Sequence, residues 1–230
     1  MLSIVIPAYN EEKRISATVN SYKNYFKLIL RNFEIIVVCD GCTDNTPSIV
    51  RKIALKNKKV RLLTFDYKLG KGGAIVRGFD SAKGDKIGFT DADEAVSPKD
   101  FHSMLKELNK FDCVIASRRV KGAIILKKQP FRRRLCSKAF NVAINSLFWL
   151  GISDTQCGAK LMHKKAYNTI KDKIKSSGFE FDAELLWRIK RAGFSILEYP
   201  ISWKHTEHSK FDLRKGPKML LSILYLRVFG

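Results

Sequence analysis

Short apolar runs alternate with helix-like segments along the first half of this 230-residue chain. The runs lie at residues 2–6, 34–39, 60–65, 86–90 and 112–117 and are rich in β-branched residues. The segments between them carry apolar residues at helical spacing, as at Ile15, Val19, Tyr22 and Phe26. Strands that alternate with helices in this way are typical of a parallel sheet with right-handed crossovers. The pattern therefore predicts an α/β, Rossmann-like fold, with a mostly parallel sheet flanked by helices.

Charged side chains stand at the carboxyl ends of three predicted strands. Asp40 ends the second strand, Asp91 and Asp93 follow the fourth, and Arg118 follows the fifth. Ligands of parallel α/β sheets bind at this edge, so we expect these side chains to converge on one site. Two carboxylates two residues apart suit Mg²⁺ or Mn²⁺, which bind one or two carboxylates together with substrate phosphates. An ordinary acidic turn or helix cap is the alternative for this pair taken alone.

The chain carries a net charge of +21, which favours a polyanionic partner: nucleic acid, a nucleotide substrate or an anionic membrane surface. It opens directly on a strand-like run, without the pattern of a signal peptide. Its apolar runs are shorter than the roughly 18–20 residues of a membrane-spanning helix. We therefore expect a soluble or monotopic protein with neither signal peptide nor transmembrane helix.

Five scattered cysteines, an odd number, are not typical of a disulfide framework. Cys39 and Cys42 form a C-x-x-C pair, for which a redox dithiol is the alternative reading. The turn-like Asp40-Gly41 between them favours another role. A reduced, cytosolic chain is expected.

A glycine-rich segment, Gly70-Lys71-Gly72-Gly73, precedes the third predicted helix. It matches neither the dinucleotide-binding fingerprint nor the phosphate loop of P-loop proteins. Its backbone N–H groups could still face a phosphate at the helix start. Close packing of the helix on the sheet explains the glycines equally well.

Two apolar helices are predicted in the second half, after a basic and irregular stretch at 119–130. The first runs from about 131 to 150 and begins with Arg132, Arg133 and Arg134, which oppose the helix dipole and favour a nearby anion. The second begins at Gly216-Pro217 and is almost wholly apolar. A basic end beside a broad apolar face is typical of a helix in the membrane interface, and a core helix is the alternative.

Four motifs in this order and spacing resemble the family 2 glycosyltransferases of GT-A fold: 7–12 (PAYNEE), 40–44 (DGCTD), 70–74 (GKGGA) and 91–93 (DAD). The second half carries 154–160 (DTQCGAK) and 181–185 (FDAEL). These resemble the dolichyl-phosphate glucose synthases more than the dolichyl-phosphate mannose synthases. Cys39 and Cys42 depart from the acidic and serine residues usual in their turn, and Glu94 departs from a usually non-acidic position.

The resemblance implies roles for individual residues of this chain. Contacts to the donor nucleotide are implied for Pro7, Tyr9, Glu11, Asp40, Lys71 and Asp91. A metal, Mg²⁺ or Mn²⁺, is implied at Asp91 and Asp93, and catalytic roles at Asp91, Asp93, Arg118 and Asp182. Binding of the acceptor phosphate is expected from Arg118, Arg133, Arg134, Lys204 and Lys210.

The resemblance and the charges together predict an inverting transferase on the cytoplasmic face of a membrane, bound peripherally. It would move a hexose from a nucleotide-diphosphate sugar, UDP-glucose favoured, to a polyprenyl (dolichyl) phosphate and form a β-linked product. Residues 1–118 would bind the donor, 119–212 the acceptor, and 213–230 the membrane interface. The alternatives are a GDP-mannose donor, or a glycan hydroxyl acceptor with Asp182 or Glu184 as base. A basic nucleic-acid-binding protein is a further alternative, which lacks a recognisable RNA motif, so no nucleic-acid partner is expected.

Overall fold

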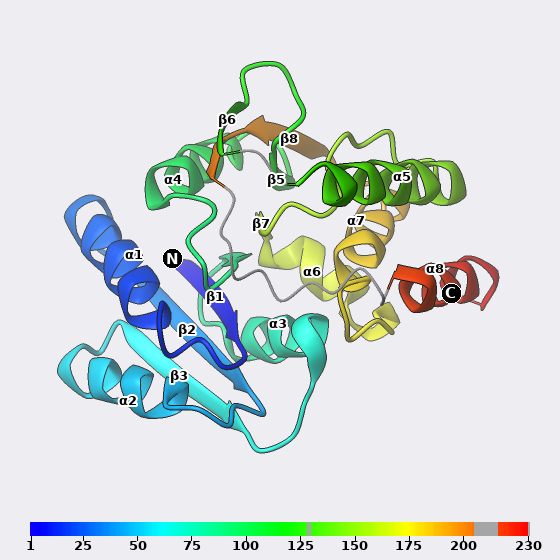
Figure 1. Cartoon of the computed structure of the whole chain (residues 1–230). Coiled ribbons are helices and arrows are strands. Elements are labelled where there is room, and N and C mark those ends of the chain that lie inside the picture. The colour runs from blue at the N-terminus through cyan, green and yellow to red at the C-terminus, as the bar shows by residue number, and fades with distance from the viewer. Residues whose placement is uncertain (128–129, 205–215, 230) are drawn as a thin grey trace.

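A seven-stranded sheet forms the centre of the computed structural model, which describes residues 1–127, 130–204 and 216–229. Its strand order is β3-β2-β1-β4-β7-β5-β8 (Figure 1). The bounds are Leu2–Ala8 (β1), Phe33–Asp40 (β2), Val60–Phe65 (β3), Lys86–Thr90 (β4), Cys113–Ser117 (β5), Ala159–His163 (β7) and Ile196–Pro200 (β8). All five strands predicted in the first half are present, and the mostly parallel α/β architecture is confirmed.

Strand β7 is the exception to parallel pairing. It lies between β4 and β5 and runs antiparallel to both, whereas the remaining pairs in the sheet are parallel. It comes from the second half of the chain, so the sheet is shared between the predicted donor and acceptor halves. Residues 154–160 are thereby brought beside the acidic residues that follow β4.

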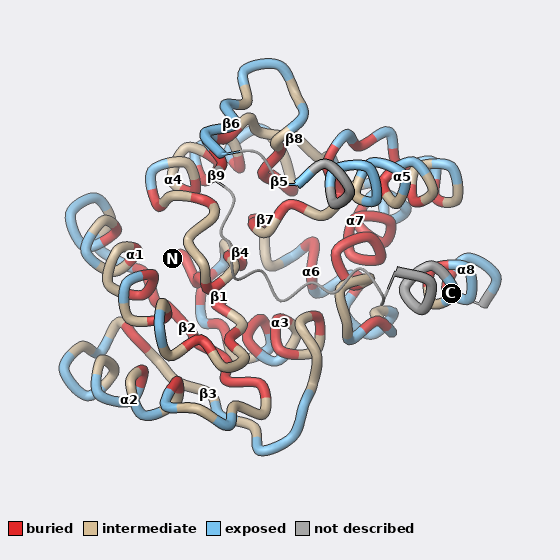
Figure 2. Tube along the Cα trace, viewed as in Figure 1, coloured by how far each residue is buried: buried red, intermediate tan, exposed pale blue. Residues whose placement is uncertain are grey.

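Helices cover both faces of the sheet (Figure 1). One face carries α1 (Ile15–Ile29), α2 (Thr46–Lys56) and α4 (Pro98–Glu107). The other carries α3 (Gly70–Ser81), α5 (Phe131–Phe148), α6 (Lys164–Ile170), α7 (Phe181–Arg191) and α8 (Gly216–Phe229). A short 3₁₀ turn, η1, spans Lys171–Lys173. Strand residues alternate between the two layers, as Ile4 and Val5 do, and α7 is buried along most of its length (Figure 2).

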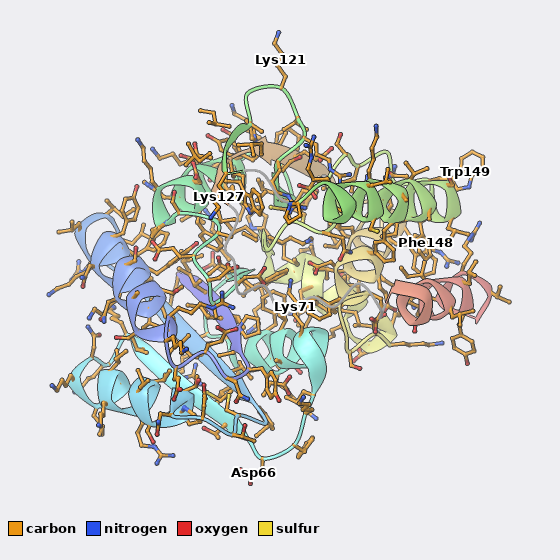
Figure 3. All side chains as sticks on the ribbon, in the orientation of Figure 1. Asp66, Lys71, Lys121, Lys127, Phe148 and Trp149 are labelled. Carbon is orange, nitrogen blue, oxygen red and sulfur yellow. The ribbon has the colours of Figure 1, made fainter. Side chains whose placement is uncertain are left out.

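A small second sheet pairs β6 (Ile124–Lys127) with β9 (Ser202–Lys204) in parallel. The stretch 119–130, predicted to be irregular, is therefore partly a strand. Ile124 and Leu126 of β6 are exposed, and the loop before β6 extends away from the body with Lys121 at its tip (Figure 3).

Helix α8 packs against α5, which is one of the two positions that its composition allowed. Ile144 and Phe148 of α5 share an apolar cluster with Ile223 and Leu226 of α8. Two polar residues of α5 face the protein, because Asn141 and Asn145 hydrogen-bond to the backbone at 152–155. No helix in the described part of the chain is both long enough and apolar enough to cross a bilayer.

The glycines at the start of α3 are explained by packing. A Cβ on Gly72 would lie 2.4 Å from the Cβ of Phe181, and one on Gly70 would lie 2.3 Å from the carbonyl oxygen of Ser177. The backbone N–H groups of Gly72 and Gly73 donate to the carbonyls of Gly178 and Ser177. Close packing, rather than a phosphate cradle, is therefore the reading that fits this helix start.

Two alanine substitutions in α3 test this close approach. Gly72→Ala should lower the free energy of unfolding by about 1–3 kcal/mol, because Phe181 must move. Gly73→Ala is the matched control: its Cβ meets only the Leu69 side chain at 3.0 Å and Ser177 at 3.8 Å, and alanine favours the helix by about 1 kcal/mol. Urea unfolding measures both, and equal stability of the two variants would contradict the packing account.

Candidate active site

The acidic turn that follows β4 lies at the carboxyl edge of the sheet. The backbone N–H of Asp91 donates to the carbonyl of Gly158 at 3.0 Å. Gly158 touches the carboxylate so closely that a Cβ there would lie 1.9 Å from Asp91 Oδ2. Asp93 Oδ1 accepts the backbone N–H of Ala95 at 3.0 Å. The turn is thus a defined structure that holds two carboxylates two residues apart.

Glu94, the third acidic residue of this segment, is directed towards α1. Its Oε1 accepts the hydroxyl proton of Ser21 at 2.6 Å, and its backbone adopts a left-handed conformation with φ of 54°. Within the described ranges, no group of three or more His, Cys, Asp or Glu side chains is arranged to hold a metal ion. The pair Asp91 and Asp93 still fits Mg²⁺ or Mn²⁺, because these ions take one or two carboxylates and complete their shell with substrate phosphates and water.

Lys71 lies at the start of α3 (Figure 3) and forms an ion pair with the acidic turn. Its Nζ lies 3.1 Å from Asp91 Oδ1 and 3.2 Å from Asp182 Oδ2. Burial lowers the pKa of Lys71, but the charges of Asp182 and Asp91 outweigh burial and the net shift is upward. Burial raises the pKa of Asp91, and Lys71 offsets this only in part. Lys71 is therefore a fixed cation beside the proposed metal ligand.

Asp182 is enclosed by two lysines. Its other oxygen accepts from Lys160 Nζ at 2.5 Å, and Lys160, in β7, is fully buried. Burial raises the pKa of Asp182, yet Lys160 and Lys71 together hold it below its ordinary value. Lys160 also donates to the carbonyl of Cys157 at 3.0 Å. These contacts fix a buried chain of charges that runs from β7 to Asp91.

The Asp40 side chain binds backbone N–H groups at the start of α3. One of its oxygens accepts the N–H of Leu69, and the other accepts that of Gly70 at 3.1 Å. Nearby, the thiol of Cys42 donates to the carbonyl of Ala8 at 3.3 Å. Asp40 thus connects the end of β2 to α3 and shapes the turn in which the resemblance places the nucleotide.

The segment 7–14 forms the other wall of this turn. Glu11 is buried, and its two carboxylate oxygens accept hydrogen bonds from Nε and Nη2 of Arg14. The backbone N–H of Glu11 donates to Thr46 Oγ1 at 2.7 Å. The ring of Tyr9 lies under Lys68 Nζ, 3.9 Å from its centre. Pro7 is half-buried and is the last residue but one of β1. The structure therefore brings the predicted nucleotide-contacting residues to one end of the sheet.

Arg118, after β5, is held by a second buried carboxylate. Its Nε and Nη2 each lie 2.7 Å from an oxygen of Asp154, whose Oδ2 also accepts the Arg118 N–H at 3.0 Å. The guanidinium stacks 5.2 Å from the ring of Trp203. Burial raises the pKa of Asp154, but Arg118 outweighs burial and lowers it below the ordinary range. Arg118 is thus fixed in orientation at the strand end, as predicted.

The other predicted acceptor residues are placed only in part. Arg134 is exposed on the first turns of α5. The backbones of Arg133 and Lys204 belong to α5 and β9, their side chains are not described, and Lys210 lies outside the described residues. Their roles stay predictions.

Comparison with known proteins now decides the family. The model of glycosyl transferase family 2 matches residues 3–171, well over half of the chain. The chain belongs to glycosyl transferase family 2. It is a glycosyltransferase, and its fold is the GT-A fold that the motifs predicted.

Relatives of this family 2 glycosyltransferase include two curated proteins. It is 32% identical to human dolichyl-phosphate beta-glucosyltransferase over 91% of this chain and 69% of that protein. It is 31% identical to glycosyltransferase AglD of Haloferax volcanii over 92% of this chain, which spans only 34% of that longer protein. Among solved structures, it aligns over its full length with 78% of glucosyl-3-phosphoglycerate synthase from Mycobacterium tuberculosis, in complex with Mn²⁺, UDP and phosphoglyceric acid. The TM-score there is 0.72 at 19% identity.

Three residues of this family 2 site escaped prediction. Burial lowers the pKa of Arg14, but the hydrogen bond and charge of Glu11, with smaller contributions from Asp93 and Asp91, outweigh burial and the net shift is upward. Lys160 and Asp154 each form a buried ion pair with a predicted residue. Lys160 and Asp154 lie within the motif 154–160, to which the resemblance gives no individual residue roles.

Removal of one charge from the buried chain tests its structural weight. Lys160→Met should lower the free energy of unfolding by about 3–5 kcal/mol, because Asp182 then keeps an incompletely paired buried charge. The double variant Lys160→Met/Asp182→Asn should recover part of that loss. If urea unfolding gives the single variant the stability of the wild type, the Lys160–Asp182 pair is not formed as described.

Proposed function

We propose that this enzyme transfers a hexose from a nucleotide-diphosphate sugar, with UDP-glucose the favoured donor, to a polyprenyl phosphate such as dolichyl phosphate. The similarity to human dolichyl-phosphate beta-glucosyltransferase across 91% of the chain supports this assignment. Direct displacement at the anomeric carbon would invert its configuration and give a β-linked sugar from an α-linked donor.

The observation that carries the proposal is the environment of the two candidate bases. Asp182 is enclosed by Lys71 and Lys160. Glu184 is fully buried, pairs with Arg188 at 2.9 Å and accepts the backbone N–H groups of Lys175 and Ser176. A hydroxyl acceptor needs a base that can reach it, and neither residue fits that role. A phosphate monoester has a second pKa of about 6 and is its own anionic nucleophile near neutral pH.

The leaving diphosphate would lie at the acidic turn. Asp91 and Asp93 would hold the divalent cation, which supplies neutralisation of the charge that develops on the leaving group. Lys71 and Arg14 approach the same carboxylates from α3 and from the segment before α1. Positioning and electrostatics would then carry the rate, without proton transfer to a side chain.

We propose that the acceptor phosphate approaches from the second half of the chain. Arg118 lies at the end of β5 with its guanidinium oriented by Asp154, and Arg119 donates to Ser137 of α5 and to the carbonyl of Ser153. In this proposal residues 1–118 bind the donor, 119–212 the acceptor, and 213–230 the membrane interface.

Two outward apolar stripes support membrane binding. On α5, Leu135 and Val142 are exposed and lie seven residues apart, and Trp149, the residue that follows the helix, is 80% exposed. Among the described side chains of α8, the exposed apolar ones are Leu221, Leu224, Tyr225 and Val228, and Arg227 beside them is exposed as well. Apolar faces of this kind beside basic residues bind the interface of an anionic bilayer. We propose that these helices rest on the cytoplasmic leaflet and hold the lipid phosphate level with the carboxyl edge of the sheet.

A transfer assay tests the proposed reaction. The enzyme should convert labelled UDP-glucose and polyprenyl phosphate into a product that extracts into organic solvent, and should use GDP-mannose or polyprenol far less well. Asp93→Asn should lower the rate about a hundredfold or more, because the cation loses one of its two protein ligands. Asp172→Asn, an exposed carboxylate on the 3₁₀ turn, is the control. Transfer to polyprenol at the same rate as to its phosphate would contradict the proposed acceptor.

Flotation with liposomes tests the membrane surface. Val142→Glu should reduce binding to anionic vesicles about tenfold, since it places a charge in the exposed stripe of α5. Leu55→Glu, at an even more exposed apolar residue on α2, should float like the wild type. Equal losses in the two variants would show that the α5 face has no special role.

A further inference from the structure

Helix α1 is joined to the acidic turn by three polar side chains. Ser21 and Tyr22 lie three and four residues after Thr18, so all three side chains are on the same side of the helix. Thr18 and Tyr22 are buried, and Ser21 is partly buried. A buried hydroxyl is retained only where it is hydrogen-bonded, and all three of these are bonded to the segment 90–96.

The contacts fall on every second residue of that segment. Thr18 Oγ1 donates to the carbonyl of Ala92 at 2.8 Å, and Ser21 donates to Glu94 Oε1 at 2.6 Å. The Tyr22 hydroxyl donates to the carbonyl of Val96 at 2.8 Å and lies 3.1 Å from the hydroxyl of Thr90. Positions 90, 92, 94 and 96 are thus hydrogen-bonded to α1, and the carboxylates at 91 and 93 alternate with them.

Glu94 shows how closely the turn is constrained. Its φ of 54° lies in the left-handed region, which residues with a side chain adopt rarely and at an energetic cost. Its side-chain hydrogen bond to Ser21 holds the chain in that conformation. On the opposite side, Gly158 stands directly against the Asp91 carboxylate. The turn is therefore fixed between α1 and the residues before β7.

We propose that Thr18, Ser21 and Tyr22 are positioning residues that preset Asp91 and Asp93 for the divalent cation. The inference rests on the proposed function, because it assigns these hydroxyls to the geometry of that cation site. Two carboxylates on a mobile turn would have to be ordered whenever the cation binds, and ordering costs binding free energy. A turn held at four alternate positions is already ordered before the cation arrives.

A purely structural role would give a different result. Hydrogen bonds that only stabilise the fold would change the melting temperature and leave the affinity for the cation unchanged. Tyr25 provides the comparison, since it lies on the same helix and its hydroxyl contacts His102 Nδ1 of α4 at 3.2 Å, away from the turn.

The test measures Mn²⁺ binding by the full chain in the presence of UDP, by electron paramagnetic resonance of free Mn²⁺, together with the melting temperature. The variant Ser21→Ala/Tyr22→Phe should bind Mn²⁺ about tenfold more weakly, since it removes two of the three hydroxyls that order the turn. Tyr25→Phe should stay within about twofold of the wild type, and Ser21→Thr, which keeps the hydroxyl, should bind as the wild type does.

Each outcome decides the matter. If the double variant and Tyr25→Phe bind Mn²⁺ as tightly as the wild type, the hydroxyls serve the fold alone and the inference is wrong, while the proposed function stands. If the wild-type protein binds no Mn²⁺ with UDP, the cation site of the proposed function fails and this inference fails with it. A tenfold loss in the double variant that Tyr25→Phe does not share supports the positioning role.

Discussion

The buried ion pairs around Asp182 hold the two halves of this enzyme together at the active edge. Lys71 comes from α3, Lys160 from β7 and Asp182 from α7, so one carboxylate joins three elements that are distant in sequence. Charges removed from water cost several kcal/mol each unless they are paired and hydrogen-bonded. The arrangement therefore tolerates little change in the positions of these elements. It also fixes the ammonium group of Lys71, which faces Asp91.

The carboxylates near the strand ends divide into two environments with different chemistry. Asp40, Asp154 and Asp182 are buried, and their oxygens accept from backbone N–H groups, arginine or lysine. The Asp91 side chain is 36% exposed, and its Oδ1 lies 3.1 Å from Lys71 Nζ. The three buried carboxylates hold neighbouring elements together. The acidic turn is where we propose that a cation and a diphosphate bind. In the proposed reaction, an acceptor that brings its own negative charge needs no base from these buried carboxylates.

The sequence predicted the features that follow from local pattern. Apolar runs and helical spacing located the five strands of the first half, and the rule that ligands bind at strand ends placed Asp40, Asp91 and Arg118 together. Strand β7 was missed because Lys160 interrupts its apolar pattern, and a buried lysine makes sense only once Asp182 is known to face it. Likewise the backbone partners of the α5 asparagines at 152–155 were not predicted, because the tertiary fold sets them. Long-range pairing of polar groups leaves no signature in a single sequence.

The central claim is that the acceptor phosphate is itself the nucleophile and that the protein supplies no base. The pH dependence of kcat/KM for the acceptor tests it most directly, measured with polyprenyl phosphate and with a phosphonate analogue of higher second pKa. If the phosphate dianion reacts, the acidic limb of the profile should lie near pH 6 for the phosphate and move upward with the analogue. A limb that keeps the same pKa with both acceptors would report a base on the protein and contradict the account.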